Sequence, residues 1–551
     1  MLQQFAYEQC VARWYKRIKR LCREKLKKSI VWHRYKNDLK GFPLIKKRGI
    51  FMKKKLLTVC MALCMVFSFN AAGCSTQSNV ADTATDVQLY FWKSGEGLEY
   101  MEKIVNDYNS KQSKYKVSLE YDSQASVITK TLDLGTENTY DLYFTQLITM
   151  AYNSEFVSFD DVLDSTVEGE VMTIREKIYP SLLNGVKNSD GTSNFLPYGG
   201  NWVSLIYNTD IIDGEKYQLP RTTDELEYLV IDLVNDAELQ KKNIKPWLFY
   251  NSSGGGNGYW VYPMTAWQVQ YDGLDYYNNT FMKLKGTDGN TPSKEILTKQ
   301  DGRYKALQVA EKLITPTTIH PECTNTNFTK VQTLFLQGQS VLNVNGGWLL
   351  NESSGTANVA MMKLPVISSI VEKLEDTDMT DETLSEIIRQ IDEGADFSSL
   401  CSEKDFARIK EARNVLYNNG AQHLIFIPEY SKAIDGAKDF VKYFFSDEGI
   451  ATKMKYTNLP CSAKLVDESK FDVSKLDQWH STLFGFSDTA TAITGLISKS
   501  EVFTNMGDDG LLGVSYAMPF CAANPNDRKN SEQVWNSVLN RINENWEDWI
   551  K

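Results

Sequence analysis

Short apolar runs alternate with helix-spaced apolar residues from Val87 onward, and this alternation limits the possible folds most strongly. Val87–Phe91 has the pattern of a strand, and residues 117–121 alternate as a second strand. Apolar residues at three- and four-residue steps over 98–108 and 127–132 indicate helices, and Tyr140–Phe144 is a third short apolar run. This β-α-β-α-β order predicts the α/β class, with a mainly parallel sheet covered by helices.

The predicted sheet also indicates where a ligand would bind. In open sheets of this type, ligands lie at the carboxyl ends of the strands. Trp92-Lys93-Ser94-Gly95 follows the first predicted strand, and Thr145-Gln146 follows the third. We therefore expect these two stretches to meet at one edge of the sheet.

The charge is distributed unevenly along the 551 residues. Residues 1–51 carry 15 Lys and Arg against 3 Asp and Glu, whereas the chain from Cys74 onward carries 42 basic against 67 acidic side chains. Neutralising a polyphosphate requires clustered Lys and Arg, which this acidic body lacks. We therefore expect no nucleic-acid partner.

The segment from Met52 to Cys74 has the layout of a bacterial secretion signal. Three lysines (53–55) precede the uncharged stretch Leu56–Phe69, which is too short for a permanent membrane helix. Ala71-Ala72-Gly73-Cys74 resembles a lipobox, in which the cysteine is diacylated and becomes the mature first residue, although Ala71 stands where leucine is usual. We expect residues 52–73 to be removed, Cys74 to carry the lipid, and residues 74–86 to form a flexible tether. The alternative is ordinary cleavage beside an incidental cysteine.

Residues 1–51 do not fit a signal, because a signal's charged region directly precedes its apolar core. The codons for Arg48-Gly49 can form a purine-rich ribosome-binding sequence in front of Met52. Our hypothesis is that translation starts at Met52. The competing interpretation is a genuine basic arm that binds anionic lipid or nucleic acid.

Two further helical regions stand out. Residues 366–419 form an acidic segment whose apolar residues 384, 387, 388 and 391 share one helix face, with a stop at Gly394 and a capped restart at Ser402. Near the carboxyl terminus, Trp535, Trp546 and Trp549 recur at helical spacing, which favours core packing.

The usual sequence signatures of enzymes are missing. The chain contains no G-x-S-x-G, no phosphate-binding G-x-x-x-x-G-K-[ST], no H-E-x-x-H and no C-x-x-C. The histidines after Cys74 are too scattered to suggest a metal site, and no cofactor is expected: His320, His423 and His480. Cysteines 323, 401, 461 and 521 are interpreted as reduced packing residues, with disulfides as the alternative.

Four stretches in order resemble the sugar-binding group of bacterial solute-binding proteins, the extracellular components of ABC importers that include maltose-binding protein. Leu196–Tyr198 with Leu205–Ile211 resembles the first crossover and the strand ending in Tyr-Asn, and Leu219–Leu226 resembles the opening of the next helix, with Thr223 in place of the usual Trp. Phe335–Val341 with Asn345-Gly346-Gly347-Trp348 is similar to the Phe-x-x-Gly…Gly-x-Trp pattern. Ala437–Gly449 is the most specific match. The resemblance extends from Val87 to the carboxyl terminus.

This resemblance implies a two-lobed periplasmic-binding-protein-like (Venus flytrap) fold with a ligand cleft between the lobes. The implied lobe 1 comprises 87–196 and 421–455, and the implied lobe 2 comprises 197–420, including the acidic insertion 366–419, and most of the helical part 456–551. It also implies capture rather than catalysis, by lobes that close over a carbohydrate and present it to the permease. We expect a monomer anchored by Cys74 on the extracellular face of the membrane.

Sugar binding needs aromatic faces for the C–H side of a ring and polar groups for the hydroxyls. The aromatic candidates occupy strand ends, family-matched positions or Gly- and Asn-rich surroundings: Trp348, Trp92, Trp202, Trp260 and Trp267. The polar candidates are Asp141, Gln146, Asn201 and Asn345. For each tryptophan, packing in the core is the alternative.

Two other functions share these sequence features. A secreted lipoprotein glycosidase with an unrecognised pair of carboxylates is one alternative, since acidic residues are plentiful. A ligand sensor with the same fold is the other. An enzyme would alter a labelled oligosaccharide, whereas a binding protein would return it unchanged.

Overall fold

The computed structural model describes residues 84–146, 155–188, 191–250, 258–284, 292–324, 327–353, 358–494, 502, 506, 518–522 and 524–551. The sequence from Met52 to Cys74 and residues 1–51, with their predicted signal, lipid anchor and start, lie outside the described residues. The first described strand, β1, begins at Thr85, so the last two residues of the predicted tether 74–86 belong to a strand.

The first sheet has five strands in the order β2-β1-β3-β10-β4. Strand β1 runs parallel to β2 and β3, as the sequence pattern predicts, whereas β10 is antiparallel to both of its neighbours. The strands are β1 (Thr85–Trp92), β2 (Tyr115–Asp122), β3 (Leu142–Thr145), β4 (Leu196–Pro197) and β10 (Leu424–Phe426).

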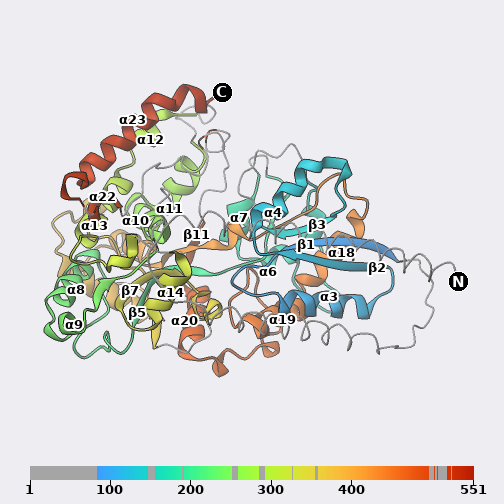
Figure 1. Cartoon of the computed structure of the whole chain (residues 1–551), viewed down its shortest axis with the longest axis horizontal. Helices are drawn as coiled ribbons and strands as arrows, with labels where there is room; N and C mark the ends of the chain where they lie inside the picture. Colours follow the sequence, from blue (N-terminus) through green and yellow to red (C-terminus); the bar gives the residue numbers. More distant parts are fainter. Residues whose placement is uncertain are drawn as a thin grey trace, which may run out of the picture. The chain divides into compact units, whose positions relative to one another are not determined.

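This sheet buries both faces, which explains its nearly continuous apolar strands. Leu89 and Phe91 belong to a core formed with α3, α18 and α19, whereas Tyr90 belongs to the core on the other face. The regular helices of this lobe are α3 (Glu99–Lys111), α4 (Ala125–Thr129), α5 (Asp160–Leu163), α6 (Ile174–Lys177), α7 (Pro180–Val186), α18 (Ile434–Phe444) and α19 (Asp447–Thr457), with the 3-10 segment η1 (Lys130–Glu137). Figure 1 shows α3 beside β2, and α4 near β1 and β3.

The second sheet has six strands, with the path β11-β9-β5-β7-β6 and β8 paired to β5. Strand β5 is antiparallel to β7, β8 and β9, whereas β6 is parallel to β7. The strands are β5 (Trp202–Asn208), β6 (Lys245–Trp247), β7 (Ser340–Gly346), β8 (Val359–Met361), β9 (Val415–Asn418) and β11 (Thr491–Ile493).

Helices pack around this second sheet in the largest apolar core of the described residues. Helix α10 contacts α13, β5 and β9, and the carboxyl-terminal helix α23 packs on α12 and α13. The helices are α8 (Thr223–Asn235), α9 (Ala237–Lys241), α10 (Val261–Asp272), α11 (Leu274–Tyr276), α12 (Lys294–Thr298), α13 (Asp301–Leu313), α14 (Phe328–Leu336), α15 (Leu349–Glu352), α16 (Asp381–Asp392), α17 (Glu403–Asn414), α20 (Gln478–Thr489), α22 (Met518–Cys521) and α23 (Ser531–Trp549). Short 3-10 or π segments complete the lobe and its connections: η2 (Gly258–Trp260), η3 (Tyr277–Phe281), η4 (Pro321–Thr324), η5 (Ser368–Lys373), η6 (Asn419–Gln422), η7 (Glu468–Lys470), η8 (Val473–Lys475) and η9 (Pro525–Asp527).

The acidic segment 366–419 is part of this second core. The face of α16 predicted to be apolar is buried, and Ser402 caps α17 by accepting a hydrogen bond from the Asp405 backbone N–H at 3.1 Å. The segment is not helical to its end, however, because Val415–Asn418 forms β9 between β5 and β11.

The chain passes from the first sheet to the second between β4 and β5, and returns between β9 and β10. It enters the second sheet again after α19, through the segment that leads to α20 and β11. Two sheets joined by crossing segments therefore form two lobes, and the crossings lie beside the strand ends at which the sequence places a ligand.

Candidate functional site

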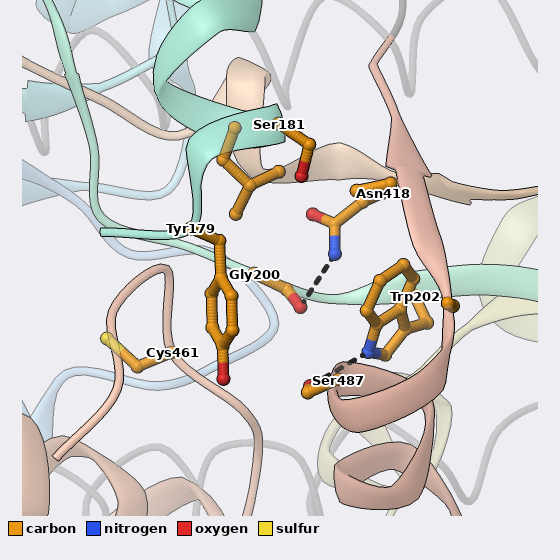
Figure 2. Close-up of a pocket in the computed structure, with 10 residues that line it drawn as sticks. Tyr179, Ser181, Gly200, Trp202, Asn418, Cys461 and Ser487 are labelled. Carbon is orange, nitrogen blue, oxygen red and sulfur yellow. Dashed lines mark hydrogen bonds between the residues drawn. The ribbon is translucent and has the colours of Figure 1, made fainter. Parts of the chain in front are cut away.

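The candidate site is built around the crossing residues 198–201 and 419–423. Asn418 Nδ2 donates to the Gly200 carbonyl at 3.0 Å, and the Asn419 backbone N–H donates to the Asn201 carbonyl at 3.0 Å. These bonds hold the two crossings side by side. Figure 2 shows the first bond, with Trp202 and Tyr179 on either side of Gly200.

A small hollow lies beside these crossings, with a cavity volume of about 20 Å³. Its polar and aromatic lining includes Tyr179, Trp202, Asn418 and Ser487, and Trp202 Nε1 donates to Ser487 Oγ at 3.2 Å (Figure 2). Pockets that enclose small ligands usually measure about 300–1,000 Å³. The crossings are therefore closely packed in this arrangement, and a ligand of several rings requires the lobes to separate.

A buried ion pair supports the crossing from the first lobe. Glu96 Oε2 lies 2.9 Å from Lys453 Nζ, and both side chains are almost fully buried. Lys453 also donates to the Tyr198 carbonyl at 2.6 Å, and Asn201 Nδ2 donates to Glu96 Oε1 at 2.5 Å. The network joins the loop after β1, helix α19 and the first crossing, and it compensates two charges that would otherwise be costly to bury.

Several buried polar atoms near this network have no hydrogen-bond partner among the residues that the structure describes. They are the Tyr198 hydroxyl, Asn201 Oδ1, Asn419 Oδ1, His423 Nδ1 and Thr145 Oγ1. An unpaired buried polar atom costs roughly 1–3 kcal/mol, so such groups normally find a partner in water or a ligand. Their common location near the crossings indicates a polar binding surface.

His423 contributes a neutral imidazole to this surface. Burial lowers the pKa of His423 to about 4, with nearby Glu96 raising it and Lys453 lowering it. The ring lies 5.0 Å from Trp92 and 5.3 Å from Tyr198, between centroids. At neutral pH the imidazole therefore carries no charge, and because Nε2 lies 3.4 Å from Asn419 Nδ2, Nδ1 is the ring nitrogen left to pair with a ligand.

The second lobe presents an aromatic cluster at the end of β7. The rings of Tyr259 and Trp348 are 5.8 Å apart, those of Tyr259 and Tyr262 are 5.4 Å apart, and those of Tyr262 and Tyr417 are 4.4 Å apart. Phe328 packs against Tyr259 at 5.3 Å. The cluster supplies the planar apolar faces that a sugar ring requires.

Trp348 has a specific local geometry. It is 8% exposed and directly precedes α15. A Cβ at position 346 would lie 2.5 Å from Trp348 Cε3 and closer still to two other atoms of the same ring. Gly346 therefore makes room for the tryptophan ring itself.

The structure brings together only some of the predicted site residues. Trp92, Trp202 and Asn201 lie at the crossings, Trp348 lies at the end of β7, and Gln146 directly follows β3 at the predicted edge. Trp92 is partly exposed, and its Nε1 donates to the Ser123 carbonyl at 3.2 Å.

The other predicted residues occupy structural positions. Trp260 and Trp267 are fully buried, and Trp267 Nε1 donates to the Pro365 carbonyl at 3.0 Å. Asn345 is buried within β7, where it accepts a hydrogen bond from the Gly346 N–H. Asp141 lies at the opposite end of β3 and accepts from the Gln88 N–H at 2.9 Å and from Ser431 Oγ at 2.8 Å. Burial or hydrogen bonds within the protein thus account for the positions of all four side chains.

Sequence reasoning missed His423, Asn419, Tyr259, Glu96 and Lys453. No motif surrounds His423 in the sequence, so its position at the crossings could not be predicted. Tyr259 could have been found, because it directly follows the Ser- and Gly-rich stretch 252–258. Glu96 and Lys453 are far apart in the chain, so only the fold pairs them.

Other features bear on the class of protein. Among the described residues, no group of three or more His, Cys, Asp or Glu side chains is arranged to hold a metal ion. Among the described cysteines, Cys323, Cys461 and Cys521 are buried, and Cys401 is partly buried. Within the same part of the chain, no helix combines the length and apolar character needed to cross a membrane.

Solved structures with a similar fold are solute-binding proteins. Apo RafE from Streptococcus pneumoniae has 16% identity and a TM-score of 0.53 over 85% of this chain and 99% of its own. A protein from a study of xylan utilisation by Caldanaerobius polysaccharolyticus has 13% identity and a TM-score of 0.55 over 83% of this chain and 100% of its own. The solute receptor AcbH, described as preferring β-D-galactopyranose, has 12% identity and a TM-score of 0.54 over 83% of this chain and 99% of its own. These likenesses confirm the two-lobed α/β fold.

A comparison with curated protein sequences gives no match. A sequence profile, in contrast, matches residues 103–477, which is more than half of the chain, and its family is described as bacterial extracellular solute-binding proteins. The match includes both crossings, the Glu96-bound Lys453 and the end of β7 with Trp348. The chain belongs to the bacterial extracellular solute-binding protein family.

Proposed function

We propose that this protein captures a carbohydrate, and specifically an oligosaccharide, between its lobes and delivers it to the permease of an ABC importer. The observation that carries the proposal is the combination of aromatic rings with buried, unpartnered polar atoms around the crossings. Solved structures of similar fold include proteins whose descriptions name xylan utilisation and β-D-galactopyranose.

The chemistry of this surface suits a neutral polyol. Sugar hydroxyls can both donate and accept, so they can pair with an amide oxygen such as Asn201 Oδ1 and with a neutral imidazole such as His423. The C–H faces of the same sugar pack on aromatic rings. A ligand without hydroxyls would leave the polar atoms unpaired, which opposes its binding.

Delivery requires the protein to stay near its permease. We propose a diacyl anchor on Cys74 at the extracellular face of the membrane, a monomeric body, and lobes divided near residues 196, 420 and 455. The strand membership of the two sheets supports these boundaries, since β1–β4 and β10 share one sheet and β5–β9 and β11 share the other. The match to an extracellular family supports the location.

The proposal is tested by a thermal-shift screen of the purified protein against neutral mono- and oligosaccharides. A ligand at 100 times its dissociation constant stabilises the folded state by about 2.7 kcal/mol. The expected result is a raised melting temperature with one carbohydrate class, and chromatographic recovery of that sugar unchanged. Release of shorter sugars would favour a glycosidase, and no shift with any sugar would contradict the proposal.

Trp348→Ala tests the aromatic part of the site. Loss of one large apolar contact should weaken sugar binding by about 1.5–3 kcal/mol, or roughly 10- to 100-fold. Trp267→Ala is the matched control, because this fully buried ring should affect folding stability and leave the affinity of the folded fraction unchanged. Equal affinities for Trp348→Ala and the wild type would assign Trp348 to the core alone.

A further inference from the structure

The short helix α15 follows Trp348 directly and contacts the opposite lobe at two points. Asn351 Nδ2 donates to the Thr457 carbonyl, at the end of α19, with a distance of 2.8 Å. The Glu352 side chain lies against the backbone of Gly95, in the loop after β1. Because α15 belongs to the second lobe, both contacts exist only when the lobes are together.

The contact at Gly95 leaves no space for a side chain. A Cβ at position 95 would lie 2.7 Å from Cγ and 2.8 Å from Cδ of Glu352, which is closer than real Cβ contacts. Moving the Glu352 side chain aside would break the hydrogen bond that its carboxylate accepts from Gln332 Nε2 on α14 at 2.7 Å. Gly95 has no positive φ, so alanine is compatible with the local backbone.

The surface that receives α15 is held rigidly. Lys453 pairs with Glu96, the residue after Gly95, and lies one helical turn before Thr457. Thr457 Oγ1 donates to the Lys453 carbonyl at 2.9 Å. The buried ion pair therefore fixes the Gly95 backbone relative to the Thr457 carbonyl.

A third contact joins Gly347 to Asn201 on the first crossing. A Cβ at Gly347 would be 3.2 Å from Asn201 Oδ1, and Asn201 Nδ2 donates to Glu96 Oε1. The residues on both sides of Trp348 therefore contact groups that belong to the first lobe or to the crossing.

We infer that α15 couples ligand contact at Trp348 to lobe closure, with Asn351 and Glu352 as positioning residues that dock on Gly95 and Thr457. This inference rests on the proposed function for the ligand, but the docking contact itself does not. A ligand that stabilises the docked arrangement shifts the population toward closed lobes. A side chain at position 95 opposes docking and leaves the Trp348 ring in place.

Cross-linking tests the docking contact without any sugar. In the pair Gly95→Cys/Glu352→Cys, the Cβ positions are close enough for a disulfide, whose Cβ···Cβ separation is about 3.5–4.5 Å. Mild oxidation should give a 95–352 cross-link, detected by peptide mass spectrometry. The control pair Leu134→Cys/Glu352→Cys, with the exposed Leu134, should give none. Equal yields from the two pairs would overturn the docking contact.

Binding measurements test the coupling, with the carbohydrate found in the thermal-shift screen. Gly95→Ala should weaken affinity about 10-fold, which corresponds to about 1.4 kcal/mol, mainly through faster dissociation. Gly95→Ala/Glu352→Ala should return the affinity to within about 3-fold of the Glu352→Ala single variant, because the obstructing side chain is gone. Unchanged affinity of Gly95→Ala, or no recovery in the double variant, would overturn the coupling. A cross-link without any sugar binding would instead reject the proposed function and leave the docking contact standing.

Discussion

Gly449 shows how one residue of the family-like stretch 437–449 determines its local packing. It lies in the first turn of α19, where its N–H donates to Ser446 Oγ at 3.1 Å. A Cβ at this position would lie 2.6 Å from the Tyr443 carbonyl oxygen and still closer to that of Phe444. Ser446 of the motif therefore caps α19. Gly449 leaves the space that the tight turn between α18 and α19 requires.

We expect Gly449→Ala to reduce the free energy of unfolding by about 1–3 kcal/mol, because the added methyl group must displace rigid backbone. Gly485→Ala is the matched control, since a Cβ there would meet no atom within 4 Å on the exposed face of α20. The control should gain about 0.5–1 kcal/mol from helix propensity. Denaturant unfolding of both variants measures the difference, and a stable Gly449→Ala would contradict the packing argument.

The burial of a neutral His423 predicts that the free energy of unfolding depends on pH. Its pKa is about 4 in the folded protein because burial disfavours the imidazolium, whereas an unfolded histidine has a pKa near 6.5. The unfolded state therefore binds the proton first as the pH falls. The stabilisation of the folded state by a neutral His423 is complete above about pH 6.5 and is lost as the pH falls toward 4. It amounts to about 3 kcal/mol of the free energy of unfolding.

The variant His423→Asn should lose stability less steeply than the wild type between pH 6.5 and 4. Urea unfolding at several pH values gives the slope of stability against pH for each protein. Comparison of the two slopes removes the contribution of carboxylates, which both proteins share. Parallel slopes would show that His423 is not buried as a neutral ring.

At the scale of elements, the sequence predicted α16 and the start of α17 well. Four apolar residues at helical spacing define the buried face of α16, and Ser402 caps α17 as expected. These features depend on nearby residues, so local patterns are sufficient. Strand β9 was missed because it continues directly from α17, and its pairing with β5 and β11 involves residues far away in the chain.

The candidate site shows the same contrast between features set by nearby residues and features set by contacts far apart in the chain. Trp92 and Gln146 could be placed because strand ends follow from the apolar runs. The Glu96–Lys453 pair and the polar atoms around His423 could not, since the crossings alone bring them together. The partners of Asp141, the Gln88 N–H and Ser431 Oγ, could not be predicted either, because they lie far from it in the chain.

The acidic insertion should unfold together with the second lobe. Ile388 is fully buried in α16 and belongs to the main core of that lobe. Ile388→Ala should therefore cost about 2–5 kcal/mol. Phe397→Ala, between α16 and α17, should change stability by less than about 0.5 kcal/mol because this ring is 72% exposed. A separate, earlier unfolding transition of residues 366–414 in hydrogen exchange would contradict this prediction.

At the scale of the whole molecule, the proposed importer role requires the predicted secretion signal to place the proposed binding site outside the cell. Cys74→Ser should leave the body folded but remove it from the membrane fraction, or stall it as an uncleaved precursor. Mass spectrometry of membrane-extracted wild type should find a diacylated Cys74 as the first residue. An unmodified Cys74, or any other mature terminus, would contradict the anchor.

The central claim is that the protein binds a carbohydrate reversibly without altering it. The two lobes, their crossing segments and the coupling helix α15 are all given roles in this binding. Calorimetric titration of the carbohydrate selected by the thermal-shift screen tests this claim most directly. We expect saturable binding of one sugar per chain, with a negative heat-capacity change from the buried apolar faces. Sustained heat release from turnover, or no saturable binding of any carbohydrate, would contradict it.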